Sequence, residues 1–396
     1  MDGALTTRTT PRDVDRLIEG VRCLQPEIDA VRDQFDQRRR LPPGLVDSMR
    51  ASGIFGLWLP KSLGGAALTV VDYVKVIEEL ARIDGSVGWC ASIGASYSRL
   101  AGYLEPDVAE GIFGGGGTVV AGQLMATARA VAVAGGYRVT GRWAFGSGIE
   151  HSDWTIGIGV VHDGDVPRLE PDGAPVERLV FFPTSAAEII DTWHVAGLRG
   201  TGSHDYSVTD LFVPENHSIE VITPLPTVPG PLYALPFRAV FGVAIAAAAL
   251  GIARGAIDTF EKLAFARAAR GGPGQLRDTA AVQADVGRAE SILRSGRALL
   301  LETARDAWEE IEAGGSDSLR LRAHLRLANT QAAVASAQAV DLMYNAGGGT
   351  SVYEASRLER YFRDIHAATQ HRAVSVGNYE LGGSVLLGLD PGMRRL

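Results

Sequence analysis

The chain has 396 residues, of which 46% are hydrophobic and 21% charged, values typical of a globular protein with two or three packed domains. Its net charge of −8, without a polybasic cluster, argues against binding to nucleic acid or to a membrane surface. The two cysteines, Cys23 and Cys90, are too few and too far apart for a disulfide framework or a zinc site. A reduced, cytoplasmic setting is therefore expected, and residues 1–12 hold no apolar core for a signal peptide.

The first third of the chain is predicted to be helical. Apolar residues recur at helical spacing over residues 14–35, and Pro42-Pro43 opens a short helix over 44–51 that Gly53 ends. An amphipathic helix is expected over 70–83. An apolar helix rich in Ala, Gly and Ser should follow over 86–104, and both should bury a face against neighbours.

The pattern changes near Gly114. Short runs with alternating or continuous apolar residues follow, separated by Gly-Gly, Asp-Gly and Pro-Asp-Gly turns. They predict a domain of short antiparallel strands over about residues 118–220. The expected strands are 118–121, 130–134, 137–145, 154–161, 179–183, 188–191 and 206–213.

Long helical segments follow a proline-rich linker over 224–236, and their short breaks predict a four-helix bundle. These segments are 237–270, 278–313, 319–346 and 357–387. The apolar stretch 239–253 is shorter than the roughly 20 residues that span a bilayer, so a buried helix with close contacts is expected. The chain is thus predicted to be α+β, mostly α, with domains 1–117 (helical), 118–223 (β) and 224–396 (bundle).

Two segments indicate the chemistry. Residues 193–214 combine Trp193, a turn with three glycines and an alternating strand, and this run resembles the flavin-site segment of the acyl-CoA dehydrogenase superfamily. Residues 341–371 combine a Gly-Gly turn, Leu-Glu-Arg and Phe-Arg-Asp, and they resemble the last two bundle helices of that superfamily. The resemblance implies the acyl-CoA dehydrogenase fold, with an N-terminal helical domain, a central antiparallel β-domain and a C-terminal four-helix bundle.

The carboxylate base of the acyl-CoA dehydrogenases has no counterpart here. In that family a glutamate usually follows the Arg-Asp pair by about eight residues, or lies early in the bundle. Here Asp364 is followed by Ile-His-Ala-Ala-Thr-Gln-His-Arg, and residues 240–256 contain no Asp or Glu. The run from Asp364 to His371 instead resembles the group D flavin-dependent monooxygenases, and the likeness extends over about residues 28–391.

This resemblance implies the oxygenase component of a two-component system. Such an enzyme takes reduced FMN or FAD (FMNH2 or FADH2) from a separate NAD(P)H-dependent flavin reductase. With O2 it forms a C4a-hydroperoxyflavin and hydroxylates an aromatic or polycyclic small molecule. The family also implies a homotetramer. Three alternatives stay open: N- or S-oxygenation within the family, an acyl-CoA dehydrogenase-like flavoprotein, and a non-catalytic flavin-binding homologue.

Two histidines are the candidates for acid–base chemistry. By resemblance His371 matches the catalytic position, where an imidazole takes a hydroxyl proton or steadies the peroxide. His366 is the second catalytic candidate, although a structural role fits it better. Residues five apart on a helix are rotated by roughly 140°, so both face one site only if the helix bends or ends. The alternative for His371 is a helix-surface imidazole.

The resemblance also implies a set of flavin contacts. Ser147 should meet flavin N5 or O4 at the end of a strand, beside Phe145 and Gly146, and Gln123 should lie at the flavin edge. Arg267 or Arg270 should bind the flavin phosphate of a neighbouring subunit, because a guanidinium suits a phosphate. Gly347 and Gly348 should approach the cofactor's tail. The alternatives are a turn serine, a core phenylalanine and a solvated helix end.

The substrate pocket is expected on the helix that contains Trp89, Ser96 and Tyr97. Related phenol hydroxylases often carry a histidine on this helix, and its absence here weakens the expectation of a simple phenolic substrate. His151 and His204 are interpreted as surface residues at strand edges. No cluster of His, Asp and Glu has metal spacing and no Gly-x-Gly-x-x-Gly follows a strand, so neither a metal nor a nicotinamide site is expected.

Overall fold

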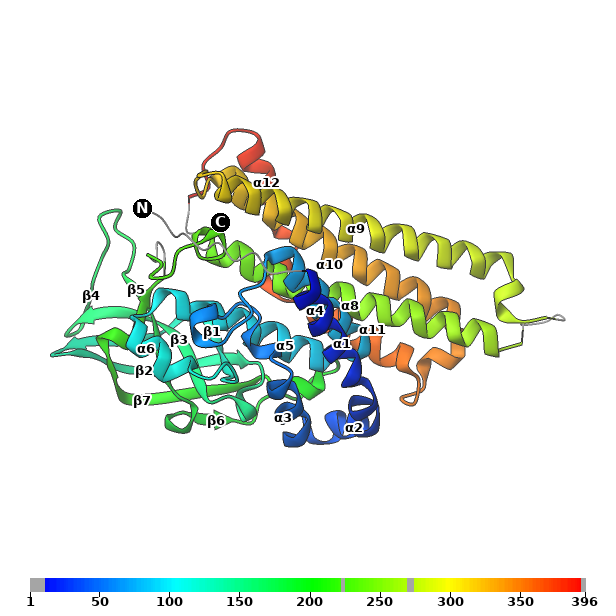
Figure 1. Cartoon of the computed structure of the whole chain (residues 1–396), viewed down its shortest axis with the longest axis horizontal. Coiled ribbons are helices and arrows are strands. Elements are labelled where there is room, and N and C mark those ends of the chain that lie inside the picture. The colour runs from blue at the N-terminus through cyan, green and yellow to red at the C-terminus, as the bar shows by residue number, and fades with distance from the viewer. Residues whose placement is uncertain (1–10, 222–224, 269–273, 393–396) are drawn as a thin grey trace.

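The computed structural model describes residues 11–221, 225–268 and 274–392. Figure 1 shows a sheet at one end of the molecule, long helices extending from it, and the N-terminal helices packed across the junction. The N-terminal helices are α1 (Pro11–Cys23), α2 (Gln25–Arg38), α3 (Pro43–Ala51), α4 (Val70–Ile83), α5 (Gly85–Tyr97) and α6 (Pro106–Phe113). The predicted helix over 14–35 is two helices, and α6 was not predicted.

Helices α4 and α5 begin where side chains cap them. Thr69 accepts a hydrogen bond from the Asp72 amide at 3.1 Å. Asp84 ends α4 and caps α5, because its carboxylate accepts from the amides of Ser86 and Val87 at 2.9 and 3.2 Å. Such caps satisfy amides that have no partner within the helix. Every residue of α5 is buried, as expected for an apolar helix inside the molecule.

The strands form a single sheet among the described residues, in the order β6-β7-β2-β1-β3-β5-β8, with β4 paired to β3. They are β1 (Val120–Val133), β2 (Gly136–Gly146), β3 (Trp154–Asp163), β4 (Val166–Pro167), β5 (Glu177–Pro183), β6 (Glu188–Ile190), β7 (His204–Pro214) and β8 (Ser218–Glu220). The expectation of a purely antiparallel domain is wrong at one place, since β1 and β3 pair in parallel. Strand β1 lies between β2 and β3 and runs antiparallel to β2 but parallel to β3.

The two runs predicted over 118–121 and 130–134 belong to one strand, β1. The register between β1 and β3 shifts between Gly122 and Ala126 and again before Ala128, so the strand continues through an irregularity rather than a turn. A second buried core lies within the sheet. There Trp143 stacks on Tyr206 with ring centroids 5.2 Å apart, and its indole N–H donates to the Ile158 carbonyl at 3.0 Å.

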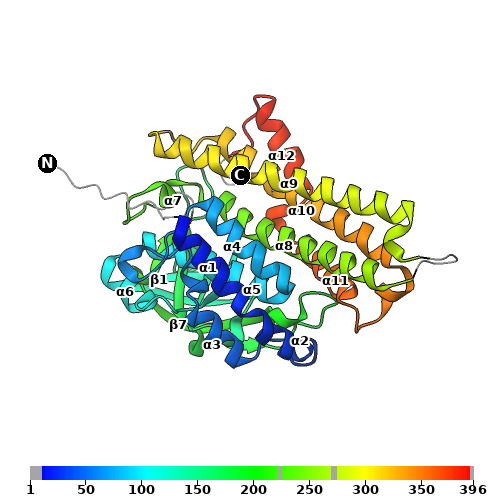
Figure 2. The same ribbon diagram turned by 45° about the vertical axis from the view of Figure 1, so that its right-hand side comes forward.

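The C-terminal half is helical, as Figure 2 shows from a second side. Its helices are α7 (Pro231–Ala234), α8 (Phe237–Ala266), α9 (Ala280–Glu312), α10 (Leu319–Gly347), α11 (Arg357–Ala368) and α12 (Gly377–Leu386). The single helix predicted over 357–387 is wrong. It ends at Ala368, and a 3-10 turn at Arg372–Val374 separates α11 from α12. The predicted ends at 223 and at Arg270 lie outside the described residues.

Helix α8 is long and apolar enough to span a membrane by composition, but 94% of its apolar window is buried inside the protein. The prediction of a buried helix with close contacts is confirmed. A Cβ placed on Gly251 would lie 2.3 Å from the Glu78 carbonyl oxygen of α4. The glycine therefore lets two helix backbones approach each other more closely than any side chain allows.

This contact predicts a contrast between two helical glycines. Gly251→Ala should lower the free energy of unfolding by about 1–3 kcal/mol, because the methyl group overpacks the α4–α8 contact. Gly287 in α9 has open space around its Cβ position, so Gly287→Ala should raise the free energy of unfolding by about 0.5–1 kcal/mol. Urea unfolding followed by circular dichroism measures both; equal midpoints for the two variants would contradict the packing argument.

Candidate active site

The candidate site lies where β2, α5, α8 and the turn after α11 meet. Ser147 follows directly after β2, and its hydroxyl oxygen accepts a hydrogen bond from the Trp89 indole N–H of α5 at 3.1 Å. Trp89 is buried, with 6% of its surface exposed. The structure thus brings together Ser147 and Trp89, which are 58 residues apart and were predicted separately.

Ser147 is the first of three linked hydroxyl groups. Its oxygen lies 2.8 Å from that of Ser203, which lies 2.7 Å from that of Thr201. Thr201 donates in turn to the Leu198 carbonyl at 2.8 Å. Ser203 and Thr201 are both buried. The sequence analysis did not assign them a role, although both lie within residues 193–214; two hydroxyl side chains around a glycine could have been the signal.

The loop that carries these hydroxyls is fixed on α11. Asp364 accepts a hydrogen bond from the Leu198 amide at 2.6 Å, and Leu198 itself adopts a left-handed backbone conformation with φ of 53°. A Cβ on Gly197 would lie 1.9 Å from the Arg363 carbonyl oxygen, so only glycine permits this docking. The two sequence segments that indicated a flavoenzyme therefore contact each other directly.

Asp364 is part of a buried electrostatic group. Burial raises the pKa of its carboxyl to about 7, and the neighbouring Asp84 carboxylate acts in the same direction. Arg360 opposes this shift and lies 3.1 Å from Asp84. Arg32 lies 3.3 Å from the same Asp84 oxygen. Two cations and two carboxylates thus join α2, α5 and α11 beneath the loop.

An uncovered aromatic surface lies beside Ser147. Phe145 is 60% exposed and adopts a left-handed conformation, with φ of 63°, which is rare for a residue with a bulky side chain. Its ring meets the edge of Trp193 at 6.2 Å, and the Trp193 indole N–H donates to the Leu198 carbonyl at 3.1 Å. A flat apolar surface next to a hydroxyl group fits one edge and face of a flavin ring.

Two further predicted contacts lie close to Phe145. A Cβ on Gly146 would lie 3.0 Å from the Tyr206 ring, so this glycine keeps the strand end compact. Gln123 lies on β1 and is partly buried. Its amide N–H donates to the Ala144 carbonyl at 3.4 Å, while its carbonyl accepts from the Leu124 amide at 2.6 Å. These two hydrogen bonds orient the Gln123 side chain toward the end of β2.

His371 also contacts Trp89. Its ring centroid is 5.9 Å from that of Trp89 and 5.8 Å from that of Phe241, an α8 residue that the sequence analysis missed because nothing distinguishes it in an apolar helix. Its Nδ1 accepts from the Ala373 amide at 3.1 Å. Burial lowers the pKa of His371 to about 4, so the ring is neutral near pH 7 and carries its proton on Nε2.

His366 lies apart from this group. Its Nε2 is 2.9 Å from the Asp341 carboxylate of α10, and 42% of its side chain is exposed. Its ring also contacts Phe362 at 4.6 Å. Because α11 ends at Ala368, the chain turns before His371, and the structure does not bring the two histidines to one site. The helix does end between them, which was the stated condition for both to face one site, but the two rings have different partners.

The predicted pocket residues of α5 differ in what they offer. Tyr97 stacks on Phe241 with centroids 5.5 Å apart, and its hydroxyl donates to the Gly122 carbonyl at 3.0 Å. Burial raises the pKa of Tyr97, so it stays neutral. Ser96 is buried and donates to the Ile93 carbonyl of its own helix at 2.8 Å. Trp89 and Tyr97 thus give aromatic walls, whereas the Ser96 hydroxyl is already satisfied.

The interpretation of His151 and His204 as surface residues is wrong. His204 is 5% exposed, and its Nδ1 accepts from the amides of Thr192 and Trp193, both at 3.3 Å. It therefore holds the start of the flavin-motif loop. Burial lowers the pKa of His151 to about 4, and its Nε2 is buried without a hydrogen-bond partner. Polar neighbours in sequence gave no indication that the fold encloses both rings.

Arg267, Gly347 and Gly348 form a separate cluster at the end of α8 and α10. Arg267 donates to the Gly347 carbonyl at 3.1 Å and to the Thr350 hydroxyl, and Gly348 has φ of 56°. In Figure 1 this end of the bundle lies far from the sheet. Arg270 lies outside the described residues. The structure thus gathers the three residues but does not bring them to Ser147 within one chain.

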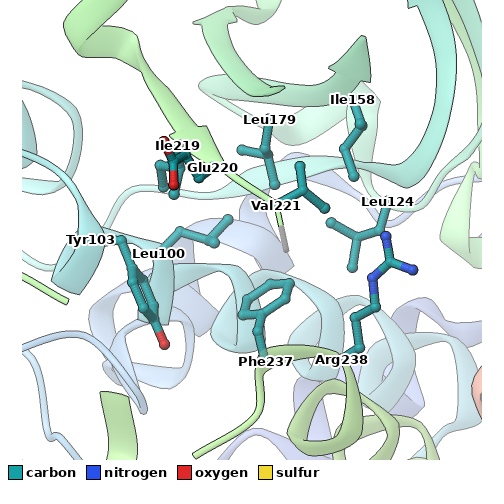
Figure 3. Close-up of a pocket in the computed structure, with 10 residues that line it drawn as sticks. All are labelled: Leu100, Tyr103, Leu124, Ile158, Leu179, Ile219, Glu220, Val221, Phe237 and Arg238. Carbon is teal, nitrogen blue, oxygen red and sulfur yellow. The ribbon is translucent and has the colours of Figure 1, made fainter. Parts of the chain in front are cut away.

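A small apolar cavity lies one helical turn beyond the Tyr97–Phe241 stack. Figure 3 shows Leu100 and Phe237 pointing toward Leu179 and Val221 across it. Its free volume of about 20 Å³ holds a water molecule but not an aromatic ring. A substrate can extend in this direction only if these side chains move. Within the described ranges, no three His, Cys, Asp or Glu side chains are placed to hold a metal ion.

Comparisons with known proteins agree with this geometry. The family described as "Acyl-CoA dehydrogenase, N-terminal domain" matches residues 19–103, and "Acyl-CoA dehydrogenase, C-terminal domain" matches residues 243–376. Indole-3-acetate monooxygenase from Pseudomonas putida is 33% identical over 92% of this chain and 93% of its own length. HsaA, the oxygenase subunit of a flavin-dependent monooxygenase from Mycobacterium tuberculosis, is 28% identical over 95% and 98% of the two chains.

A solved structure supports the same assignment. XiaF from Streptomyces sp., in complex with FADH2 and glycerol, superposes with a TM-score of 0.87 at 27% identity, over 96% of this chain and 97% of its own. The acyl-CoA dehydrogenase fold expected from the two sequence segments is confirmed. The chain belongs to the acyl-CoA dehydrogenase superfamily and, within it, to the flavin-dependent monooxygenases.

Proposed function

We propose that this chain hydroxylates an aromatic or polycyclic small molecule, as an oxygenase component that takes reduced FMN or FAD from a separate NAD(P)H-dependent reductase. One observation carries the proposal: Trp89 contacts both Ser147, which lies beside the exposed Phe145, and His371, which lies among aromatic rings. The surroundings of Ser147 suit a flavin ring and those of His371 an aromatic substrate. Relatives named for indole-3-acetate support a bicyclic aromatic acid as the first compound to test.

Reduced flavin, when bound, supplies the electrons that activate O2 for transfer of one oxygen atom to the substrate. Phe145 would pack against the flavin ring, and the Ser147 oxygen would meet its N5 edge. Trp89 and Phe241 would exclude water from the space next to His371. Gln123 and Gly146 would make the remaining contacts at the edge of the flavin ring.

His371 would orient an oxygen atom in the substrate pocket. A neutral ring whose Nδ1 accepts from the Ala373 amide can donate only from Nε2. The geometry therefore favours a hydrogen-bond donor over a free base in the resting state. Residues 365–372 and 240–256 contain no Asp or Glu, so these two segments lack the carboxylate base that α-proton abstraction from an acyl-CoA needs. His366 is proposed to act only through the packing of α11 on α10.

The separate cluster around Arg267 supports a homotetramer in which two subunits share each flavin. Phe241 and Arg267 are separated along α8 by roughly 39 Å, at 1.5 Å per residue. Phe241 connects to Ser147 through His371 and Trp89, so the Arg267 cluster lies at the far end of α8 from the residues around Ser147. Arg267, Gly347 and Gly348 of one subunit would bind the phosphate and tail of a flavin held by Ser147 of its neighbour, in an assembly with closed symmetry. We place this assembly and its reductase in the cytoplasm.

The first test of this function uses reduced flavin supplied from outside. The purified chain should not consume NADH alone. Mixed anaerobically with photoreduced FMN or FAD, then with O2 and indole-3-acetate, it should give a product one oxygen atom heavier, detected by mass spectrometry. A panel of phenols, amines and thioethers distinguishes C- from N- and S-oxygenation. Bleaching of oxidised flavin by an acyl-CoA, with no oxygenated product, would contradict the proposal.

Replacement of His371 tests its role. His371→Ala should lower product formation on the order of 10²- to 10⁴-fold with little change in flavin affinity, and His371→Gln, which keeps a donor, should lose less. His366→Ala serves as the control and should stay near the wild-type rate. Because the pKa of His371 is about 4, the ring stays neutral above about pH 5. The wild-type rate should therefore show no limb at the usual histidine pKa near 6.5.

Subunit complementation tests the shared site. Arg267→Ala and His371→Ala homo-oligomers should each be weakly active. Co-expressed with different tags and purified as mixed oligomers, they should recover up to roughly a quarter of wild-type turnover, because some sites then receive both native residues from two subunits. Absence of recovery in mixed oligomers that still bind flavin, or a monomer that holds reduced flavin, would show that Arg267 does not complete a neighbour's site.

A further inference from the structure

We infer that the hydroxyl chain Ser147–Ser203–Thr201 has a fixed direction, which makes Ser147 a hydrogen-bond acceptor toward the flavin and selects the reduced cofactor. The inference rests on the proposed function, because it needs Ser147 at flavin N5. The physical basis of this inference lies in residues of the protein itself. Four hydrogen bonds connect the Trp89 indole to the Leu198 carbonyl through three hydroxyl groups.

Both ends of this chain permit only one role. The indole N–H of Trp89 can only donate, and the Leu198 carbonyl can only accept. Trp89 donates to Ser147 at 3.1 Å, and Thr201 donates to Leu198 at 2.8 Å. Since each hydroxyl has one proton, Ser203 must donate to Thr201 and Ser147 must donate to Ser203. All four hydrogen bonds then point from Trp89 to Leu198.

The reverse direction is unfavourable. If Thr201 donated to Ser203, the Thr201 and Leu198 oxygens would face each other at 2.8 Å with no proton between them. The Leu198 carbonyl would lose the Thr201 hydroxyl as a donor and would accept only from the Thr201 amide and the Trp193 indole, each at 3.1 Å. Thr201 and Ser203 are buried, with 1% and 2% of their surface exposed, so water cannot supply a substitute proton.

Ser147 therefore commits its proton to Ser203 and keeps a lone pair for the cofactor. Reduced flavin carries a proton on N5 and can donate to this lone pair, whereas oxidised flavin presents a lone pair on N5. Two acceptors that face each other form no hydrogen bond, and a buried acceptor left unpaired weakens binding. The same side chain thus favours the reduced form and disfavours the oxidised form, without any charge.

The test compares the affinities of the intact protein for oxidised and reduced FMN and FAD, measured anaerobically by calorimetric titration. Wild type should bind the reduced forms on the order of tenfold to a hundredfold more tightly. Ser203→Ala removes the acceptor for Ser147, which frees the Ser147 proton for N5. Thr201→Val lets Ser203 donate to Ser147 instead. Both variants should reduce the preference about tenfold, mainly through tighter binding of oxidised flavin.

Two controls separate this effect from a general loss of structure. Thr201→Ser keeps the hydroxyl and should retain the wild-type preference. A second buried hydroxyl cluster, in which Thr155 lies 2.8 Å and Ser152 lies 2.9 Å from the Thr184 hydroxyl, has no link to Ser147. Thr155→Val should lower stability without changing the preference. With oxidised flavin labelled at N5, the ¹⁵N resonance should move upfield in Ser203→Ala relative to wild type, because N5 then accepts a hydrogen bond from Ser147.

The outcomes distinguish this inference from the proposed function. If wild type binds reduced flavin and forms product, but shows no preference for the reduced form, the directed chain is wrong and the function stands. The same holds if Ser203→Ala and Thr201→Val, folded by circular dichroism, keep the wild-type preference. If wild type binds neither form of flavin, the proposed function fails together with the inference.

Discussion

Docking of the loop 193–203 on α11 is the constraint on which the rest of the site depends. Asp364 holds the Leu198 amide, and Gly197 allows the two backbones to touch. From this point the loop leads to Thr201 and Ser203 on one side and to Trp193 on the other. If the loop moved, the hydroxyl that Ser147 needs as its acceptor and the aromatic edge beside Phe145 would move together.

The docking itself depends on buried charge. Asp364 and Asp84 are almost fully buried, and Arg360, on the same helix as Asp364, lies 3.1 Å from Asp84. Such groups add little net stability compared with apolar packing, but removing one member leaves an unpaired charge inside the protein. Their role here is to position the loop, because the Asp364 carboxylate fixes where the Leu198 amide lies. Burial raises the pKa of Asp364, and the neighbouring Asp84 carboxylate adds to this rise.

The proposed flavin contacts lie in two distant parts of the polypeptide. The end of β2 and α5 provide the surface around Ser147. Phe241 lies near the start of α8, and Arg267 directly follows its last residue. A helix of this length is stiff, so it separates these groups by a fixed distance. In the proposed shared site, a second copy of the chain would supply the contacts that lie at the far end of α8. Most of α8 is buried, because α4, α5 and α10 pack around it.

The sequence by itself determined the kind of fold, the order of its parts and the family. Apolar periodicity and capping residues depend on neighbours within a few positions, which is why α4, α8, α9 and α10 were predicted nearly to their ends. Helix α5 instead ends at Tyr97, before its predicted end at 104, because a 3-10 helix follows. The glycines and the Phe-Arg-Asp run marked the two segments that meet at Leu198. What only the tertiary structure decided were contacts between residues far apart in sequence: the parallel pairing of β1 with β3, the burial of His151 and His204, the break before His371, and the direction of the hydroxyl chain. A hydrogen bond between Ser147 and Trp89 joins positions 58 residues apart, and no local pattern encodes where a folded backbone brings such groups together.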